Sequence, residues 1–306
     1  MKKLFFLLFF AVVLLAGCND QNNGKAEADK PLVVTTTGQV ADAVKTIAGD
    51  MVEVKSLMGP GVDPHLYKAT QGDLQILEDA DMIFYNGLEL EGKMSDIFEK
   101  MKKEKTVVAI GESVPKERLL NDEEHPELFD PHIWFDIELW KVATHEITKS
   151  LTKEFNYSEE QFKENEAEFF KELDTLNDWT KERINEIADE QRVLVTAHDA
   201  FNYFGESNGM EVRGLQGLST DAEYGLKDIQ NVVNFLVEQN IKAVFIESSV
   251  SDKAMNAVIE GAKEKGHTIQ IGGELYSDAM GAEGTEEGTY IGMYKHNVNT
   301  IVDSLK

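Results

Sequence analysis

The chain has 306 residues, with 30 basic and 56 acidic side chains that give a formal net charge of −26. At this length two domains are expected. The acidic balance argues against nucleic acid or an anionic membrane surface as a partner, because both attract basic patches. Most of this charge is expected to be an ordinary solvated surface, although it is also compatible with attraction of cations.

The N-terminus predicts export and attachment to a lipid. Residues 1–3 are a short basic stretch, and residues 4–15 are an apolar run too short to span a membrane, which indicates a signal peptide over residues 1–17. The sequence Leu15-Ala-Gly-Cys18 resembles a bacterial lipobox, in which the cysteine is acylated, typically with palmitate, and becomes the mature N-terminus. The alternative is a soluble secreted protein in which Cys18 is incidental.

Cys18 is the single cysteine of the chain, so the fold has no disulfide and no thiolate metal ligand. Residues 18–30 are polar and lack apolar periodicity. We expect them to form a flexible tether between the lipid and the folded part.

Residues 31–157 alternate β-rich runs with helical patterns, which predicts an N-terminal α/β lobe with a parallel sheet and helices on both faces. The strands are expected at residues 32–37, 52–57, 82–85 and 107–110, and the helices at residues 39–49, 90–103, 137–155 and in the segment after His65.

The pattern Asp-Pro-His occurs twice in this lobe, at Asp63-Pro-His65 and at Asp130-Pro-His132. A residue before proline is pushed towards an extended conformation, and aspartate is a good helix N-cap. The proline then fits the first helical position. Each histidine is therefore expected at a rigid strand-to-helix corner, and two imidazoles presented in the same way predict two ligands of one site.

Residues 158–188 carry apolar side chains at helical spacing, with charges between them and no Gly or Pro. They predict one stiff amphipathic helix of roughly 45 Å that connects two lobes. Residues 189–306 then repeat the alternation and predict a C-terminal α/β lobe. Its strands are expected at residues 192–197, 243–246, 268–271 and within 210–218, and its helices at residues 200–207, 224–239, 252–265 and 290–305.

The predicted fold class is therefore α/β, with two similar parallel-sheet lobes joined by one long rigid helix. In open α/β sheets, ligands bind beyond the carboxyl ends of the strands. His198 follows one predicted strand, and Asp278 lies seven residues beyond another. Together with His65 and His132, each lobe offers two candidate ligands on the side of an interlobe cleft.

Three imidazoles and one carboxylate suit zinc, iron, nickel or manganese, and the carboxylate moves the preference towards harder cations. The alternative for each residue is a hydrogen-bonded structural role. Asp136, Asp199 and Glu247 are candidates to orient the rings, or else ordinary caps and surface acids.

The other histidines differ from the candidate ligands in their position, because they do not follow predicted strands. Three of them, His145, His267 and His296, fall on or beside predicted helices and are expected at the surface. His125 lies in the acidic loop 121–130 and is a candidate for transient metal capture.

Four stretches, Gly59-Pro-Gly-Val-Asp-Pro-His65, Asp130-Pro-His-Ile-Trp134, Thr196-Ala-His198 and Tyr276-Ser-Asp-Ala-Met-Gly281, resemble the metal-binding solute-binding lipoproteins of bacterial ABC importers. This is the adhesin-like cluster that takes up manganese and zinc. The resemblance runs from the lipobox to the C-terminus and is strongest to the manganese-binding members. It implies a metal buried between the lobes, held by His65, His132, His198 and Asp278.

The resemblance also implies a function. The protein would not be an enzyme but would capture Mn²⁺ and deliver it to an ABC permease with its ATPase. It would be a monomer, anchored by lipid on the extracytoplasmic face of the cell membrane.

Zn²⁺ is the alternative metal. Many manganese-binding members carry glutamate where this chain has His198, whereas zinc importers often have a long histidine-rich loop, which is short here and holds only His125. A zinc hydrolase is a further alternative, but the sequence has no His-Glu-x-x-His helix. An additional role in cell adhesion leaves no motif.

Overall fold

The computed structural model describes residues 30–121 and 125–306 of the chain. The predicted signal peptide, Cys18 and all but the last residue of the predicted tether fall outside these residues. Residues Pro31–Lys306 form one compact unit, whose strands make one four-stranded sheet and two two-stranded sheets. The four-stranded sheet belongs to the first lobe and the two strand pairs belong to the second.

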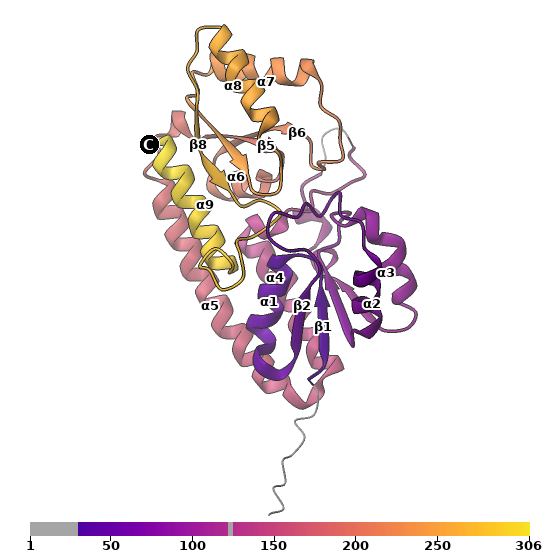
Figure 1. Cartoon of the computed structure of the whole chain (residues 1–306). Coiled ribbons are helices and arrows are strands. Elements are labelled where there is room, and N and C mark those ends of the chain that lie inside the picture. The colour runs from indigo at the N-terminus through magenta and orange to yellow at the C-terminus, as the bar shows by residue number, and fades with distance from the viewer. Residues whose placement is uncertain (1–29, 122–124) are drawn as a thin grey trace, which may run out of the picture. The chain divides into compact units, whose positions relative to one another are not determined.

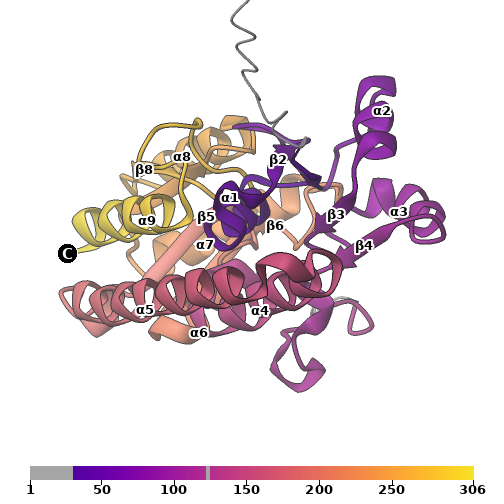
Figure 2. The same ribbon diagram turned by 90° about the horizontal axis from the view of Figure 1, so that it is seen from below.

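The first lobe contains a four-stranded parallel sheet in the order β2-β1-β3-β4. Successive side chains of its central strands point to opposite faces and are buried on both, because helices cover both faces. Helices α1 and α4 cover one face, and α2 and α3 cover the other (Figure 2). The elements are β1 (Leu32–Thr35), α1 (Gly38–Ala48), β2 (Glu53–Ser56), α2 (Gln71–Asp79), β3 (Met82–Tyr85), α3 (Ser95–Met101), β4 (Thr106–Ala109) and α4 (Ile137–Glu154).

The second lobe repeats this strand order. Its strands form the parallel pairs β5–β6 and β7–β8, and β5 lies beside β7. The order β6-β5-β7-β8 therefore corresponds to β2-β1-β3-β4 of the first lobe. The elements are β5 (Val193–His198), α6 (Asn202–Asn208), β6 (Glu211–Gln216), α7 (Leu226–Glu238), β7 (Ala243–Glu247), α8 (Lys253–Glu264), β8 (Gln270–Leu275) and α9 (Tyr290–Leu305).

Helix α5 (Glu159–Ile184) joins the two lobes and packs on both. It contacts α1 and α4 of the first lobe and α6 and α9 of the second, and Figure 1 shows it running beside both sets of strands. Its buried face is made by side chains at helical spacing, which are Phe162, Phe169, Leu173, Leu176, Thr180 and Ile184. One hydrophobic cluster extends from α1 and α4 through α5 to α9, so the two lobes share a core.

The predicted pattern of strands and helices is confirmed, with three corrections. The connecting helix has 26 residues and is about 39 Å long. It ends at Ile184, four residues before the predicted end, and a turn follows in which the N–H of Ile187 donates to the carbonyl of Ile184. The last strand begins two residues later than predicted and continues to Leu275. The segment after residue 90 forms a short 3₁₀ turn followed by α3, not one continuous helix.

The two Asp-Pro-His corners were predicted wrongly in their local structure, because neither aspartate caps a helix. Helix α2 begins at Gln71 with Thr70 as its N-cap, and α4 begins at Ile137 with Asp136 as its N-cap. Each aspartate instead accepts a hydrogen bond from the backbone N–H of the histidine two residues later, at 2.9 Å in both copies. This Asx-type turn competes with helix initiation for the same side-chain oxygen.

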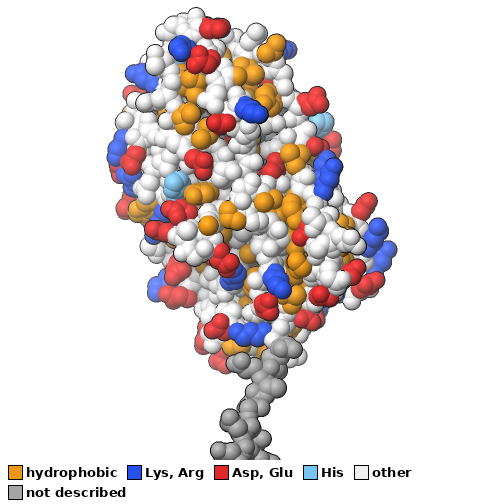
Figure 3. Space-filling view, in the orientation of Figure 1, with side chains coloured by type: hydrophobic (Ala, Val, Ile, Leu, Met, Phe, Trp, Pro, Cys, Tyr) orange, Lys and Arg blue, Asp and Glu red, His pale blue; other side chains and the backbone are white. Residues whose placement is uncertain are grey.

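The surface carries mixed charge. In Figure 3, acidic side chains are scattered over the face in view, among basic and apolar ones. Within residues 30–121 and 125–306, no helix is both long and apolar enough to cross a membrane.

The shared core predicts that α5 contributes to the stability of both lobes. Replacing the fully buried Leu173 by Ala should lower the free energy of unfolding by about 2–5 kcal/mol, because it leaves a cavity between the lobes. Chemical denaturation measures this change. The matched control is Lys171→Ala on the exposed side of the same helix, which should change stability by less than about 0.5 kcal/mol. Equal losses in both variants would contradict the shared core.

Candidate metal centre

Four side chains from four distant segments converge between the lobes. His65 and His132 come from the first lobe, and His198 and Asp278 come from the second. Each offers one nitrogen or oxygen atom, and these atoms all lie within 4.8 Å of one another. All four side chains are buried, His65 being the most exposed at 5%. The structure therefore brings together the four residues that the sequence predicts as ligands.

The Asp278 carboxylate lies at the centre of this group. Its Oδ1 is 3.3 Å from Nε2 of His132, and its Oδ2 is 3.3 Å from Nε2 of His198 and 3.8 Å from Nε2 of His65. None of these five atoms has a hydrogen-bond partner among the residues described. Buried polar atoms are rarely left unpaired, so five that face one point indicate a bound cation.

The first Asp-Pro-His corner is held from both lobes. Asp63 accepts the backbone N–H of His65 through Oδ1, and its Oδ2 accepts a hydrogen bond of 2.6 Å from the hydroxyl of Thr220 in the second lobe. Asp63 thus fixes the backbone of its histidine, while no hydrogen bond from it to the imidazole ring is seen among the described contacts.

The second corner differs in one contact. Asp130 Oδ1 accepts the backbone N–H of His132 and also lies 2.7 Å from Nδ1 of the same ring. The side-chain amide of Asn86 donates to the carbonyl of Pro131 at 3.0 Å. Asp130 therefore orients the imidazole so that Nε2 faces Asp278.

His198 is the last residue of β5, and Glu247 ends the neighbouring strand β7. Glu247 Oε1 accepts the backbone N–H of His198 at 2.9 Å, and its Oε2 lies 2.6 Å from Nδ1 of the ring. Asp278 follows β8 by three residues, in a loop that Asn297 holds through both the N–H and the carbonyl of Tyr276.

Three acids were proposed to orient the imidazole rings. Glu247 contacts the ring of His198, whereas Asp136 and Asp199 have other partners. Asp136 caps α4, and Asp199 accepts the N–H of Gly214 at 2.7 Å. Sequence reasoning missed Asp130, although it belongs to the repeated motif. The two copies look alike in sequence, and their different ring contacts arise only from the fold around them.

Comparison with known proteins gives the family. The sequence model of the family described as zinc-uptake complex component A, periplasmic (ZnuA), matches residues 33–304. The chain belongs to this family. The manganese-binding lipoprotein MntA of Bacillus subtilis is 53% identical over 98% of this chain and 97% of its own. The zinc-binding protein TroA of Treponema pallidum is 48% identical over 92% of this chain and 91% of its own.

A solved structure agrees with the fold. The periplasmic zinc-binding protein TroA of Treponema pallidum superposes with a TM-score of 0.88 at 47% identity, covering 90% of this chain and 99% of that one. Membership of the ZnuA family makes the chain a metal-binding component of an uptake system and not an enzyme.

The remaining histidines lie outside the cluster. His145 pairs with Glu166 on α5, and the rings of His267 and His296 contact backbone carbonyls. Of these three, which were expected at the surface, His145 is exposed, whereas His267 and His296 are half-buried. The metal-capture role of His125 stays a prediction.

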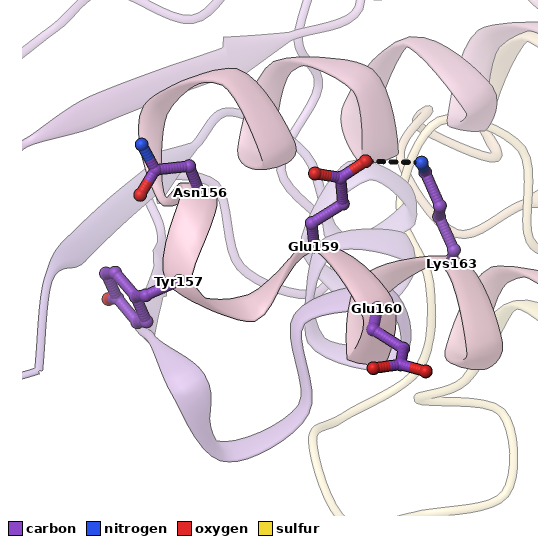
Figure 4. A pocket seen from close by; sticks show the side chains of 5 residues that line it. All are labelled: Asn156, Tyr157, Glu159, Glu160 and Lys163. Atoms are coloured by element: carbon purple, nitrogen blue, oxygen red, sulfur yellow. Dashed lines mark hydrogen bonds and ion pairs between the residues drawn. The ribbon is translucent and has the colours of Figure 1, made fainter.

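A surface depression elsewhere in the described part of the chain differs from this site in its lining. One of about 440 Å³ lies where α5 begins, lined by Asn156, Tyr157, Glu159, Glu160 and Lys163. Figure 4 shows these side chains on the turn before α5 and on its first residues, with Glu159 paired to Lys163. It includes none of the four converging residues.

The nearby carboxylates decide which rings hold protons before metal binds. Burial opposes charge on His132, but the carboxylates of Asp130 and Asp278 outweigh it and raise the pKa to about 9. Burial also opposes charge on His198, whereas Glu247 and Asp278 raise its pKa well above the usual range. Burial lowers the pKa of His65 to about 3. Burial would raise the pKa of Asp278, but the facing rings of His198 and His132 hold it well below its usual range.

These pKa directions predict proton release on metal binding. Because pH 7 lies below the raised pKa of both His132 and His198, these rings hold protons that a bound metal must displace. Apparent affinity should therefore fall as pH is lowered from about 9 to 6. Calorimetry in two buffers of different ionisation enthalpy should show about two protons released per metal at pH 7. A metal affinity that does not change between pH 9 and 6 would contradict the protonation of these two rings in the metal-free protein.

The contact of Glu247 with His198 predicts a second effect. Glu247→Gln should weaken metal binding by about 10- to 100-fold, because the neutral amide no longer stabilises and orients the ring of His198. A competition titration with a chelating dye measures the change. Glu238→Gln, at an exposed position on α7, is the matched control and should bind like the unaltered protein.

Proposed function

We propose that this protein captures Mn²⁺ outside the cytoplasmic membrane and delivers it to the permease and ATPase of an ABC importer. The single observation that carries the proposal is the buried cluster of three imidazoles and one carboxylate, whose five facing atoms lack hydrogen-bond partners among the described residues. In this role His65, His132, His198 and Asp278 are the metal ligands.

The geometry favours binding over catalysis. A hydrolytic zinc site has three protein ligands and keeps one coordination position open for water. Here four protein ligands surround one point, and all four are buried. Such a site encloses the cation and leaves no place for a reacting water, which suits a carrier that holds its cargo until it docks.

The position of Asp278 supports manganese. Its two oxygens face different rings at the same distance, 3.3 Å, so both can reach one cation. Binding through both oxygens would give three nitrogen and two oxygen ligands, more than the four of a tetrahedral zinc site. The 53% identical relative is named as manganese-binding. Zinc remains the alternative, because the 48% identical relative is named as zinc-binding.

The remaining parts of the chain fit the same role. We propose that Cys18 is acylated after removal of residues 1–17 and anchors the protein to the extracytoplasmic face of the cell membrane, with residues 18–30 as the tether. Relatives named as lipoproteins support this. The lobes would then be residues 31–157 and 189–306, joined by the connecting segment 158–188, in a protein that acts as a monomer.

Metal binding tests the ligand assignment. His65→Ala and Asp278→Ala should each weaken Mn²⁺ binding by at least about 100-fold in a titration of the purified protein, because each removes one of four ligands. His145→Ala is the control, since that ring lies on the surface and pairs with Glu166. Unchanged affinity in both ligand variants would overturn the proposal.

Metal identity needs its own measurement. Elemental analysis of protein purified from its native host should find manganese in excess of zinc. Zinc alone in that sample would replace manganese as the cargo and leave the ligand assignment intact.

A further inference from the structure

The peptide group just before Asp278 is held by two side chains from the other lobe. The indole N–H of Trp134 donates to the carbonyl oxygen of Ser277 at 3.2 Å. The side-chain amide of Gln39 donates to the same oxygen at 3.2 Å. Trp134 and Gln39 are each 1% exposed, and Ser277 is fully buried. One carbonyl of the second lobe is thus fixed by two donors of the first.

The two donors lie on different segments of the first lobe. Gln39 is the second residue of α1, and Trp134 lies two residues after His132, with its ring 5.3 Å from that imidazole. The hydrogen bond from Trp134 therefore links Ser277 to the segment that carries His132, and the one from Gln39 links it to α1 of the same lobe.

The Asp278 loop is also fastened firmly to its own lobe. Asn297 makes two hydrogen bonds to Tyr276, and the hydroxyl of Ser248 donates to the carbonyl of Ala279 at 3.0 Å. The hydroxyls of Ser249 and Ser277 lie 3.0 Å apart. The loop is thus held on both sides of Asp278, and the two contacts to Ser277 tie it to the lobe that carries His65 and His132.

Packing alone does not account for Gln39. Its Oε1 is buried and has no hydrogen-bond partner among the described residues. An unpaired buried carbonyl oxygen is unfavourable, and an apolar side chain of the same size would fill the space without it. The presence of a glutamine at position 39 is therefore best explained by the hydrogen bond that its amide N–H donates to Ser277.

We propose that Gln39 and Trp134 are positioning residues for metal binding. By holding the Ser277 carbonyl they place the Asp278 carboxylate between the three rings before the cation arrives. They thereby set both the affinity of the site and the use of two carboxylate oxygens. This inference rests on the proposed function, since it requires Asp278 to be a ligand.

A double-mutant cycle tests whether Gln39 acts through Asp278. Gln39→Met keeps the length of the side chain and removes the donor. It should weaken Mn²⁺ binding by about 3- to 30-fold, the effect of one hydrogen bond, mainly through faster release to a chelator. In the Asp278→Ala background the same change should have no further effect. Gln230→Leu, at an exposed position on α7, is the control.

A spectroscopic measurement separates positioning from general loosening. In the Co²⁺-loaded protein, Gln39→Met should shift the d–d absorption, because the carboxylate changes its coordination, whereas the control should not. Thermal unfolding of the metal-free variants shows whether each is folded, and Gln39→Leu replaces Gln39→Met if the latter is not.

The outcomes distinguish this inference from the proposed function. If Gln39→Met weakens binding equally with and without Asp278, or leaves affinity and absorption unchanged, the positioning role is wrong. If Asp278→Ala binds Mn²⁺ as tightly as the unaltered protein, the ligand assignment itself fails.

Discussion

The burial of the Asp278 carboxylate against three imidazoles is the constraint on which the rest of the structure depends. A carboxylate in a low-dielectric interior is strongly unfavourable unless positive charge faces it. Here the facing rings come from both lobes, His198 from the lobe of Asp278 and His65 and His132 from the other. The same carboxylate therefore favours both the closed arrangement of the lobes and the binding of a cation.

The carboxylates behind the rings extend this argument. Asp130, Glu247 and Asp278 are all buried around the site. In the metal-free protein, the raised pKa values of His132 and His198 mean that two protons offset part of this negative charge. A dication that displaces both protons leaves the net charge of the cluster unchanged. The site can thus exchange protons for metal without a change in buried charge.

We expect the packing around the site to limit how far the lobes can separate. Helix α5 is uninterrupted from Glu159 to Ile184 and contributes to a core that both lobes share. Hydrogen bonds between the lobes lie beside the four converging residues, from Thr220 to Asp63 and from Gln39 and Trp134 to Ser277. Opening would break these contacts together, and a continuous helix resists bending.

The sequence alone determined the alternation of strands and helices, because local periodicity and propensity follow from neighbouring residues. The strand Met82–Tyr85 and the helix Tyr290–Leu305 were predicted to the residue. The four converging side chains were also named in advance, from strand ends and from motifs. The tertiary structure decided the contacts between residues that lie far apart in the sequence. Asp130 reaches its ring while Asp63 instead bonds Thr220, and Gln39 meets Ser277 across 238 residues. Such contacts depend on how the two lobes pack, which no local pattern encodes.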